Sequence, residues 1–344
     1  MVTSPPSRYV RLSPNVARTV ILALAALIVF GLMAPSSVPA QAASRDEGDL
    51  ALYLAVADRV DAGEWYYDAT GTELRARGYA TSPFLNWRLP TSAWTLRALD
   101  DGASLALGGL ALAVVVAWAM ALRSAKLDLP HALAGGLLVA CAVAIATVDD
   151  VAAFHEVWAG LLIALSLALR QWSWVAAVVV GALAVAFREL AVAYLVVMLA
   201  CAVIEKHRRE AWAWAGVVAA FVVGLALHAS VVSERIAGTD TTNGWLALGG
   251  WPFVLSTANW NLIVLVVGGA VTALFVPLAI LGAASWDHPL GLRLGATVAA
   301  YVLAFLVVGR SDNSYWGITV APLLAVSLVF TPSGLRSLVR AGFP

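Results

Sequence analysis

Apolar runs of about 20 residues, separated by short polar segments, recur along most of the chain, and each is long enough to cross a hydrocarbon core of about 30 Å as an α-helix. Helices are expected because lipid cannot satisfy exposed backbone groups. The pattern predicts an all-α polytopic membrane protein, with about ten transmembrane helices in a single domain. The expected spans are residues 17–35, 103–122, 130–148, 152–170, 172–187, 190–204, 211–229, 260–284, 292–309 and 315–331.

The composition agrees with this fold class. The chain has 344 residues, of which 61% are hydrophobic and only 12% are charged. The formal net charge is zero, so nothing indicates a nucleic-acid partner. Cys141 and Cys201 both lie in apolar runs and are expected to be small core residues rather than a disulfide.

The basic residues predict which ends of the helices face the cytoplasm. Twelve of the 21 fall on one side of the predicted bundle, in short segments close to helix ends. Because such loops stay inside the cell, both termini and a tail at 332–344 are expected to be cytoplasmic, which makes the long loop 41–102 extracytoplasmic. That second side holds all but four of the 21 acids, and the loops on the cytoplasmic side show no comparable polar clusters. The four exceptions are Asp128, Glu205, Glu210 and Asp287.

The first span has a second interpretation. Arg18, an apolar run and then Ala40-Gln41-Ala42 also match a signal peptide with a small-residue cleavage site. Cleavage would remove one helix but would leave every loop on the same side of the membrane.

The loop 41–102 is expected to be ordered. Residues Asp46–Ala62 predict an amphipathic helix that ends at Gly63, and Asp49 and Tyr53 lie four residues apart on one of its faces. The aromatic stretch Trp65-Tyr66-Tyr67-Asp68 follows. Such a stretch suits either a sugar-binding surface or a helix that lies in the headgroup region.

Further along, Pro83 and Pro90 predict an extended segment that leads into a helix at Ser92–Asp100. This segment carries Asn86 and Arg88. Their side chains suit hydrogen bonds either to a ligand or to the helix bundle, where they would fix the loop.

Three more polar clusters fall on the same side of the predicted membrane. Charged groups at membrane depth cost roughly 2.5–3.5 kcal/mol each on insertion scales, so they usually have a partner or a task. The alternatives are solvated loop acids and structural ion pairs. The convergence of four separate segments on one face favours a functional site. The clusters are Asp149-Asp150 with His155-Glu156, Arg188-Glu189, and the segment from Arg310 to Trp316, which includes Asp312 and Asn313.

The first loop resembles that of the GT-C superfamily of membrane glycosyltransferases. The resemblance rests on Asp49-Leu50-Ala51-Leu52-Tyr53, which follows the first span and precedes Gly63 and the aromatic stretch. Many members have Asp-Glu-x-x-Tyr here, whereas this chain has Leu50 in place of the second acid and Asp46-Glu47 upstream. The large first loop, short mid-chain helices and polar helix ends extend the resemblance over most of the chain. It is similar to small bacterial members, which lack a soluble carboxy-terminal domain.

The resemblance implies a hexosyl- or pentosyltransferase in a bacterial cytoplasmic membrane. A sugar would pass, with inversion, from polyprenyl phosphate to a hydroxyl of a glycan, lipid or protein acceptor on the extracytoplasmic face of that membrane, in the synthesis of a cell-envelope glycan or glycolipid. Asp49 would take the acceptor's proton, and Arg310 and Arg188 would stabilise the leaving phosphate. A divalent cation assists some relatives, but no ligand set in this chain calls for one. Further expected contacts to substrate are Tyr53, Asn86, Arg88, His155, Glu156, Glu189, Asp312 and Asn313.

Two other functions are kept as alternatives. In a transporter or lipid flippase, intramembrane arginine and glutamate residues would line a path across the membrane. In a non-catalytic membrane scaffold, the first loop would bind a partner in the cell envelope. The gathering of charge at one face favours surface chemistry over a path through the bilayer.

Overall fold

A computed structural model describes residues 5–33, 48–148, 150–237, 240 and 247–344. These residues form helices joined by turns, and their only β-type pairing is an isolated bridge between Ser7 and Trp286. The α-helices are α1 (Pro14–Met33), α2 (Gly48–Asp61), α3 (Tyr66–Ala76), α4 (Thr91–Leu99), α5 (Gly102–Ser124), α6 (Leu129–Val143), α7 (His155–Leu169), α8 (Trp174–Phe187), α9 (Val192–Ile204), α10 (Arg208–Ser233), α11 (Gly250–Thr257), α12 (Leu262–Val267), α13 (Thr272–Ser285), α14 (Pro289–Val307), α15 (Ala321–Ser327) and α16 (Thr331–Gly342).

Within the described residues, six helical segments are long and apolar enough to cross a membrane. The chain is therefore a polytopic helical membrane protein. The apolar helices α7, α8, α9 and α13 are shorter, and the expected total of ten spans remains a prediction. The six segments are α1, α5, α6 with its 3-10 extension to Thr147, α10, α14 and Ala321–Gly342.

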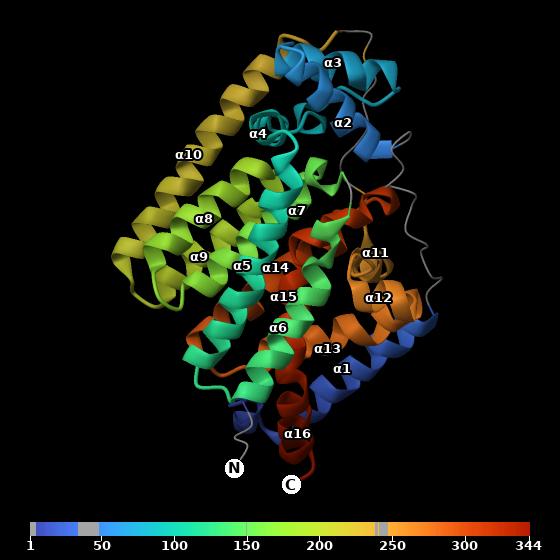
Figure 1. The fold of residues 1–344 in the computed structure, drawn as a ribbon. Coiled ribbons are helices and arrows are strands. Elements are labelled where there is room, and N and C mark those ends of the chain that lie inside the picture. Colours follow the sequence, from blue (N-terminus) through green and yellow to red (C-terminus); the bar gives the residue numbers. More distant parts are fainter. Residues whose placement is uncertain (1–4, 34–47, 149, 238–239, 241–246) are drawn as a thin grey trace.

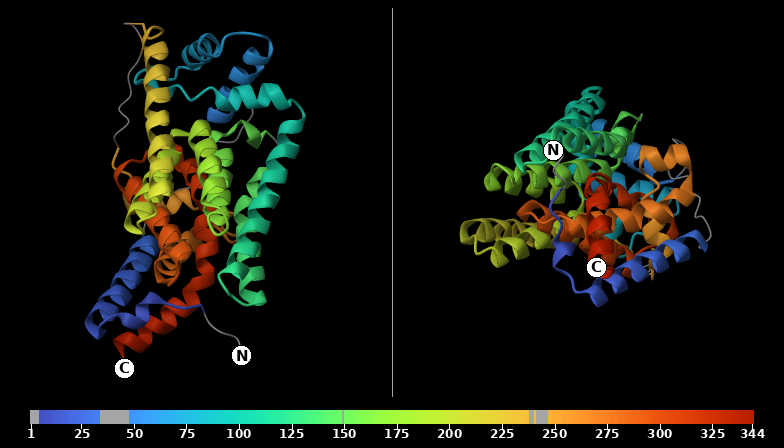
Figure 2. Two further views of the ribbon diagram at one scale, coloured as in Figure 1. Left: turned by 90° about the vertical axis from the view of Figure 1, so that its left-hand side faces the viewer. Right: turned by 90° about the horizontal axis from the view of Figure 1, so that it is seen from below.

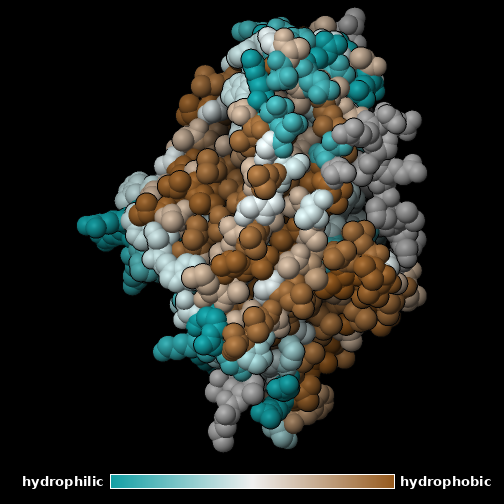
Figure 3. Space-filling view, viewed as in Figure 1, coloured by the Kyte–Doolittle hydropathy of each residue, from teal (hydrophilic) through white to brown (hydrophobic). Residues whose placement is uncertain are grey.

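Apolar side chains cover the middle of the molecule. In the face shown in Figure 3, brown residues dominate the centre, whereas teal residues gather at the end formed by α2 and α3 and at the opposite end. Leu22, Leu105 and Val223 are among the exposed apolar residues of the long helices. A surface of this kind suits contact with lipid rather than water.

The loop helices α2, α3 and α4 form a cap at one end of the bundle, and α16 lies at the other end (Figures 1 and 2). The helix α7 lies in the centre, where it packs against α5, α8 and the 3-10 helix η7 (Ser311–Thr319). Gly160 of α7 permits this approach, because a Cβ there would lie only 2.5 Å from the carbonyl oxygen of Ile318. The close contact fixes η7 below the cap.

Some predicted spans are not continuous α-helices, and two examples show this. The expected helix 260–284 breaks at Gly268, whose φ of +101° suits glycine alone, and α12 and α13 lie on either side. The expected helix 315–331 begins as the 3-10 helix η7 and continues as α15. The hydropathy pattern reveals neither the break at Gly268 nor the 3-10 segment, because both spans remain apolar throughout.

The segment 332–344 is not a free tail. Most of it forms α16, which packs against α1 and α13. The Arg18 side chain donates a hydrogen bond to the carbonyl oxygen of Gly342 at 2.8 Å, and its guanidinium lies 5.3 Å from the ring centroid of Phe343. The alternative cleavage site after the first span, Ala40-Gln41-Ala42, lies outside the described residues.

A partly buried ion cluster lies at the end of the bundle away from α2, where no comparable polar cluster was expected. Arg170 binds both carboxylate oxygens of Glu210 at 2.7 Å, and Arg293 lies 2.7 Å from Glu205. The cluster joins the ends of α7, α9 and α10 to α14. The sequence did not reveal it, because these four residues are spread over more than a hundred positions.

Candidate functional site

Asp49 and Tyr53 lie on one face of α2, as their spacing predicts. The same face continues with Val56 and Val60, which are buried in the core and hold the helix in place. Asp49 is in the first turn, where a negative charge interacts favourably with the helix dipole. Its carboxylate oxygen Oδ2 accepts a hydrogen bond from the hydroxyl of Tyr315 in η7.

A polar cavity of about 200 Å³ opens beside Asp49. It lies between α2, the segment 78–88 and the start of η7. The sequence predicted that this segment is extended, but its residues Phe84–Asn86 form the 3-10 helix η2. Seven of the eleven predicted site residues therefore meet around one space, although they come from three distant parts of the sequence. The polar lining is Asp49, Tyr53, Tyr79, Asn86, Arg88, Arg310, Asp312 and Asn313.

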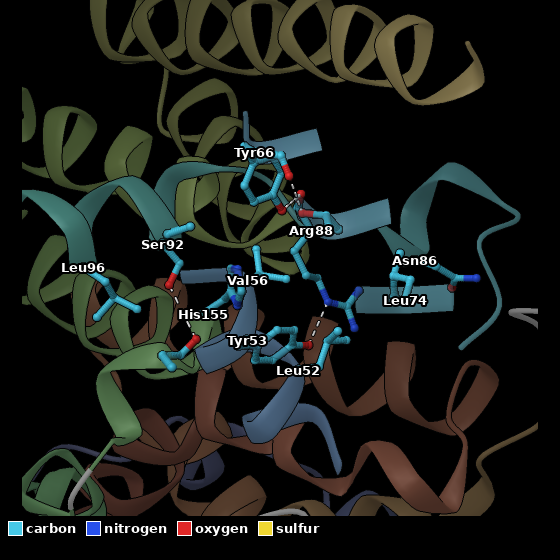
Figure 4. A pocket seen from close by; sticks show the side chains of 13 residues that line it. Leu52, Tyr53, Val56, Tyr66, Leu74, Asn86, Arg88, Ser92, Leu96 and His155 are labelled. Atoms are coloured by element: carbon cyan, nitrogen blue, oxygen red, sulfur yellow. Dashed lines mark hydrogen bonds between the residues drawn. The ribbon is translucent and has the colours of Figure 1, made fainter. Parts of the chain in front are cut away.

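The Arg88 side chain forms part of the wall of this cavity. Its Nε donates to the hydroxyl of Tyr53 at 3.1 Å (Figure 4), and its Nη1 lies 3.4 Å from Glu189. Only 11% of the side chain is exposed. Burial alone would lower the pKa of Arg88, but the tyrosine hydroxyls and buried carboxylates around it raise this pKa well above its usual value. The cavity wall therefore carries a fixed positive charge.

Behind the wall, a chain of buried charges continues into the bundle. Glu189 lies 2.6 Å from Nη1 of Arg188, and Nε of Arg188 lies 2.6 Å from Glu156. The Arg188 and Glu156 side chains are fully buried. Arg188 is thus placed behind the cavity rather than on its surface, and it holds Glu189 next to Arg88.

His155 lies under the ring of Tyr53, with the two ring centroids 4.7 Å apart. It faces a smaller neighbouring space of about 20 Å³ that also borders Ser92 and Tyr66 (Figure 4), which is roughly the room that one water needs. Its Nδ1 has no hydrogen-bond partner among the described residues. His155 therefore supports Tyr53 and does not line the Asp49 cavity.

Arg310 also lines the cavity, and its side chain is 39% exposed. Its guanidinium forms two hydrogen bonds with the Asp312 carboxylate, at 3.2 and 3.1 Å. Exposed ion pairs of this kind contribute only about 0–1 kcal/mol. An anion in the cavity can replace Asp312 at little cost.

The remaining polar residues of the cap mainly fix its shape. Asn86 donates to the carbonyl oxygens of Ala80 and Ser82, so it holds the segment 78–88. The Tyr66 hydroxyl donates to the carbonyl oxygen of Arg88 at 2.6 Å. Of the aromatic stretch, Trp65 remains half exposed. Asp46, Glu47 and Asp149 lie outside the described residues.

Tyr315 and Tyr79 are site residues that the sequence did not single out. Tyr315 lies 266 positions from Asp49, so no spacing rule connects the two. Tyr79 lines the cavity, where burial and the neighbouring Asp49 carboxylate raise its pKa. The only sequence signal for Tyr315 was its place in the polar segment that begins at Arg310.

An apolar groove of about 560 Å³ lies on the other side of the segment 78–88. Arg88 faces the polar cavity, whereas Leu89 and Pro90 line the groove. Between them, the carbonyl oxygen of the buried Trp87 accepts a hydrogen bond from Nε2 of His228 at 3.0 Å. The rest of the groove comes from the start of α3 and from α4, α8 and α10, with Trp65, Trp94, Val185, Phe221, Gly224 and Val231 among its lining residues.

No metal site is evident in this part of the chain, since the described residues contain no group of three or more His, Cys, Asp or Glu residues that could hold an ion. The site consists of two carboxylates, Asp49 and Asp312, two guanidinium groups, Arg88 and Arg310, and an adjoining apolar groove. No protein-family model, curated protein or solved structure matches the chain.

Proposed function

We propose that this protein is a GT-C-type glycosyltransferase. It transfers a hexosyl or pentosyl group from a polyprenyl-phosphate-linked donor to the hydroxyl of a glycan, lipid or protein acceptor. The observation that carries the proposal is the meeting of Asp49, Arg88 and Arg310 around one cavity. This is the set of groups that the reaction requires: a base for the acceptor and cations for the leaving phosphate.

In the proposed reaction, the acceptor hydroxyl transfers its proton to Asp49 as its oxygen attacks the anomeric carbon of the sugar. The bond from that carbon to the phosphate oxygen breaks, and its electron pair leaves with the polyprenyl phosphate. Arg88 and Arg310 stabilise the negative charge that develops on the phosphate. A single displacement of this kind inverts the anomeric configuration.

In this proposal Arg88, and not Arg188 as the sequence predicted, contacts the donor phosphate. Arg188 is fully buried and forms ion pairs with Glu156 and Glu189. Its proposed role is to keep Glu189, and through it Arg88, in position.

The apolar groove is the proposed site of the polyprenyl tail. The segment 78–88 places it directly next to the polar cavity, so an amphiphile can put its head on one side of this segment and its tail on the other. The tail would gain roughly 0.8 kcal/mol for each buried methylene. An amphiphilic donor also suits the exposed apolar surface of α10, which borders the groove.

In the proposed topology, the cap formed by α2, α3 and α4 faces outward from a bacterial cytoplasmic membrane, and both termini are cytoplasmic. Nucleotide sugars are not available on that side, which favours a lipid-linked donor. The positions of basic residues support this orientation.

The test is transfer by the purified protein in proteoliposomes, with a panel of labelled polyprenyl-phosphate-linked hexoses and pentoses. Asp49→Asn should abolish product formation, because the amide cannot accept the proton. The control is Asp58→Asn on the same helix, which is exposed and does not line the cavity. Near-normal turnover by Asp49→Asn would remove the base role. Movement of labelled lipid across the vesicle membrane without any glycosidic product would instead identify a flippase.

A further inference from the structure

Tyr315 holds one carboxylate oxygen of Asp49. The tyrosine is fully buried, and its hydroxyl donates a hydrogen bond to Oδ2. Its ring packs against Phe154, with the two centroids 5.5 Å apart. Packing in the core therefore fixes the direction in which the Tyr315 hydroxyl points toward Asp49.

The backbone that carries Tyr315 is also fixed. Gly160 allows η7 to pack directly on α7, and Gly317 brings η7 against the backbone of Thr257 in α11. A side chain at either glycine would overlap neighbouring backbone atoms. Two helices thus hold η7 in place, and Tyr315 cannot follow Asp49 if the carboxylate rotates.

We propose that Tyr315 is a positioning residue, which fixes the rotation of the Asp49 carboxylate relative to the acceptor hydroxyl. The proposal rests on the base role of Asp49 in the proposed function. The carboxylate torsion of an aspartate is broad and roughly two-fold, so a fixed donor on one oxygen selects one orientation.

The same segment also carries Arg310, five residues before Tyr315. One short stretch of backbone thus joins the proposed phosphate contact to the orientation of the base. The two residues should nevertheless affect different kinetic constants. Removal of the Tyr315 hydroxyl should lower kcat and leave the KM for the donor unchanged, whereas removal of the Arg310 guanidinium should raise that KM.

The experiment compares Tyr315→Phe with Tyr301→Phe. Tyr301 is an equally buried tyrosine whose hydroxyl donates to the carbonyl oxygen of Leu190 at 3.0 Å, away from Asp49. The first readout is the infrared carboxylate band of Asp49, assigned as the band that Asp49→Asn removes. This band should shift in Tyr315→Phe and stay in place in Tyr301→Phe. The second readout is kcat, which should fall roughly tenfold to a hundredfold in Tyr315→Phe only.

The infrared readout separates the two proposals, because it needs no substrate. An unchanged Asp49 band in Tyr315→Phe would overturn the positioning role even if the protein transfers sugar. An equal shift in both tyrosine variants would also overturn it, since the effect would then be a general loosening of the core. Normal turnover by Asp49→Asn, together with a shifted band in Tyr315→Phe, would overturn the base role and leave the contact between the two residues intact.

Discussion

Replacement of Arg188 by methionine should destabilise the protein strongly. The arginine is fully buried and lies 2.6 Å from both Glu156 and Glu189. Methionine fills a similar volume but leaves the Glu156 charge without its partner. Loss of one partner from a buried ion pair typically costs about 3–5 kcal/mol, because the remaining charge is neither solvated nor paired. The free energy of unfolding should therefore fall by about that amount.

A double variant tests whether unpaired charge is the cause. In Arg188→Met with Glu156→Gln, the buried charges that remain are Arg88 and Glu189, which already lie 3.4 Å apart. The positive and negative buried charges are then equal in number again, so the double variant should recover most of the stability that the single variant loses. The measurement is unfolding in mixed micelles with increasing dodecyl sulfate, followed by tryptophan fluorescence.

The control is Arg310→Met, which removes an exposed guanidinium and should cost no more than about 1 kcal/mol. Two results would refute the reasoning. One is an Arg188→Met variant as stable as Arg310→Met. The other is a double variant that is less stable than Arg188→Met alone, which would mean that packing, and not charge balance, controls this region.

Two further predictions concern the donor. Asp312→Asn should lower the KM for the donor by up to about fivefold, because Arg310 no longer has a competing carboxylate, and a KM that rises would contradict this. Gly224→Trp should raise the KM for a long-chain donor about tenfold relative to a short-chain analogue, since displacement of two buried methylenes costs roughly that much. Gly224 lines the groove, whereas Gly216 lies on the same helix outside it. Both glycines have open space at the position of a Cβ atom. Gly216→Trp is therefore the matched control, and equal effects of the two variants would contradict a tail in the groove.

The sequence predicted what depends on local spacing. Asp49 and Tyr53 lie four residues apart, so a helix places them on one face whatever the rest of the chain does. The structure has α2 at Gly48–Asp61, within the predicted range, and Gly63 follows its end with a φ of +94°.

The sequence could not distinguish residues that differ only in how deeply their side chains are buried. Arg188 and Arg310 both lie next to acids at helix ends and had the same predicted role. In the structure Arg188 is fully buried and Arg310 is on the cavity rim. Tertiary packing decides this difference, and a single sequence contains no record of it. The contact between Tyr315 and Asp49 was beyond reach for the same reason.

The ion cluster of Arg170, Glu205, Glu210 and Arg293 has a consequence for biogenesis. During synthesis, α7, α9 and α10 leave the ribosome before α14, so Glu205 enters the membrane before the guanidinium that lies closest to it. Until Arg293 arrives, the two carboxylates of this cluster, Glu205 and Glu210, share one guanidinium, that of Arg170. Chains that stop before α14 therefore retain a carboxylate without its closest partner, a feature by which membrane quality control can distinguish incomplete chains from finished ones.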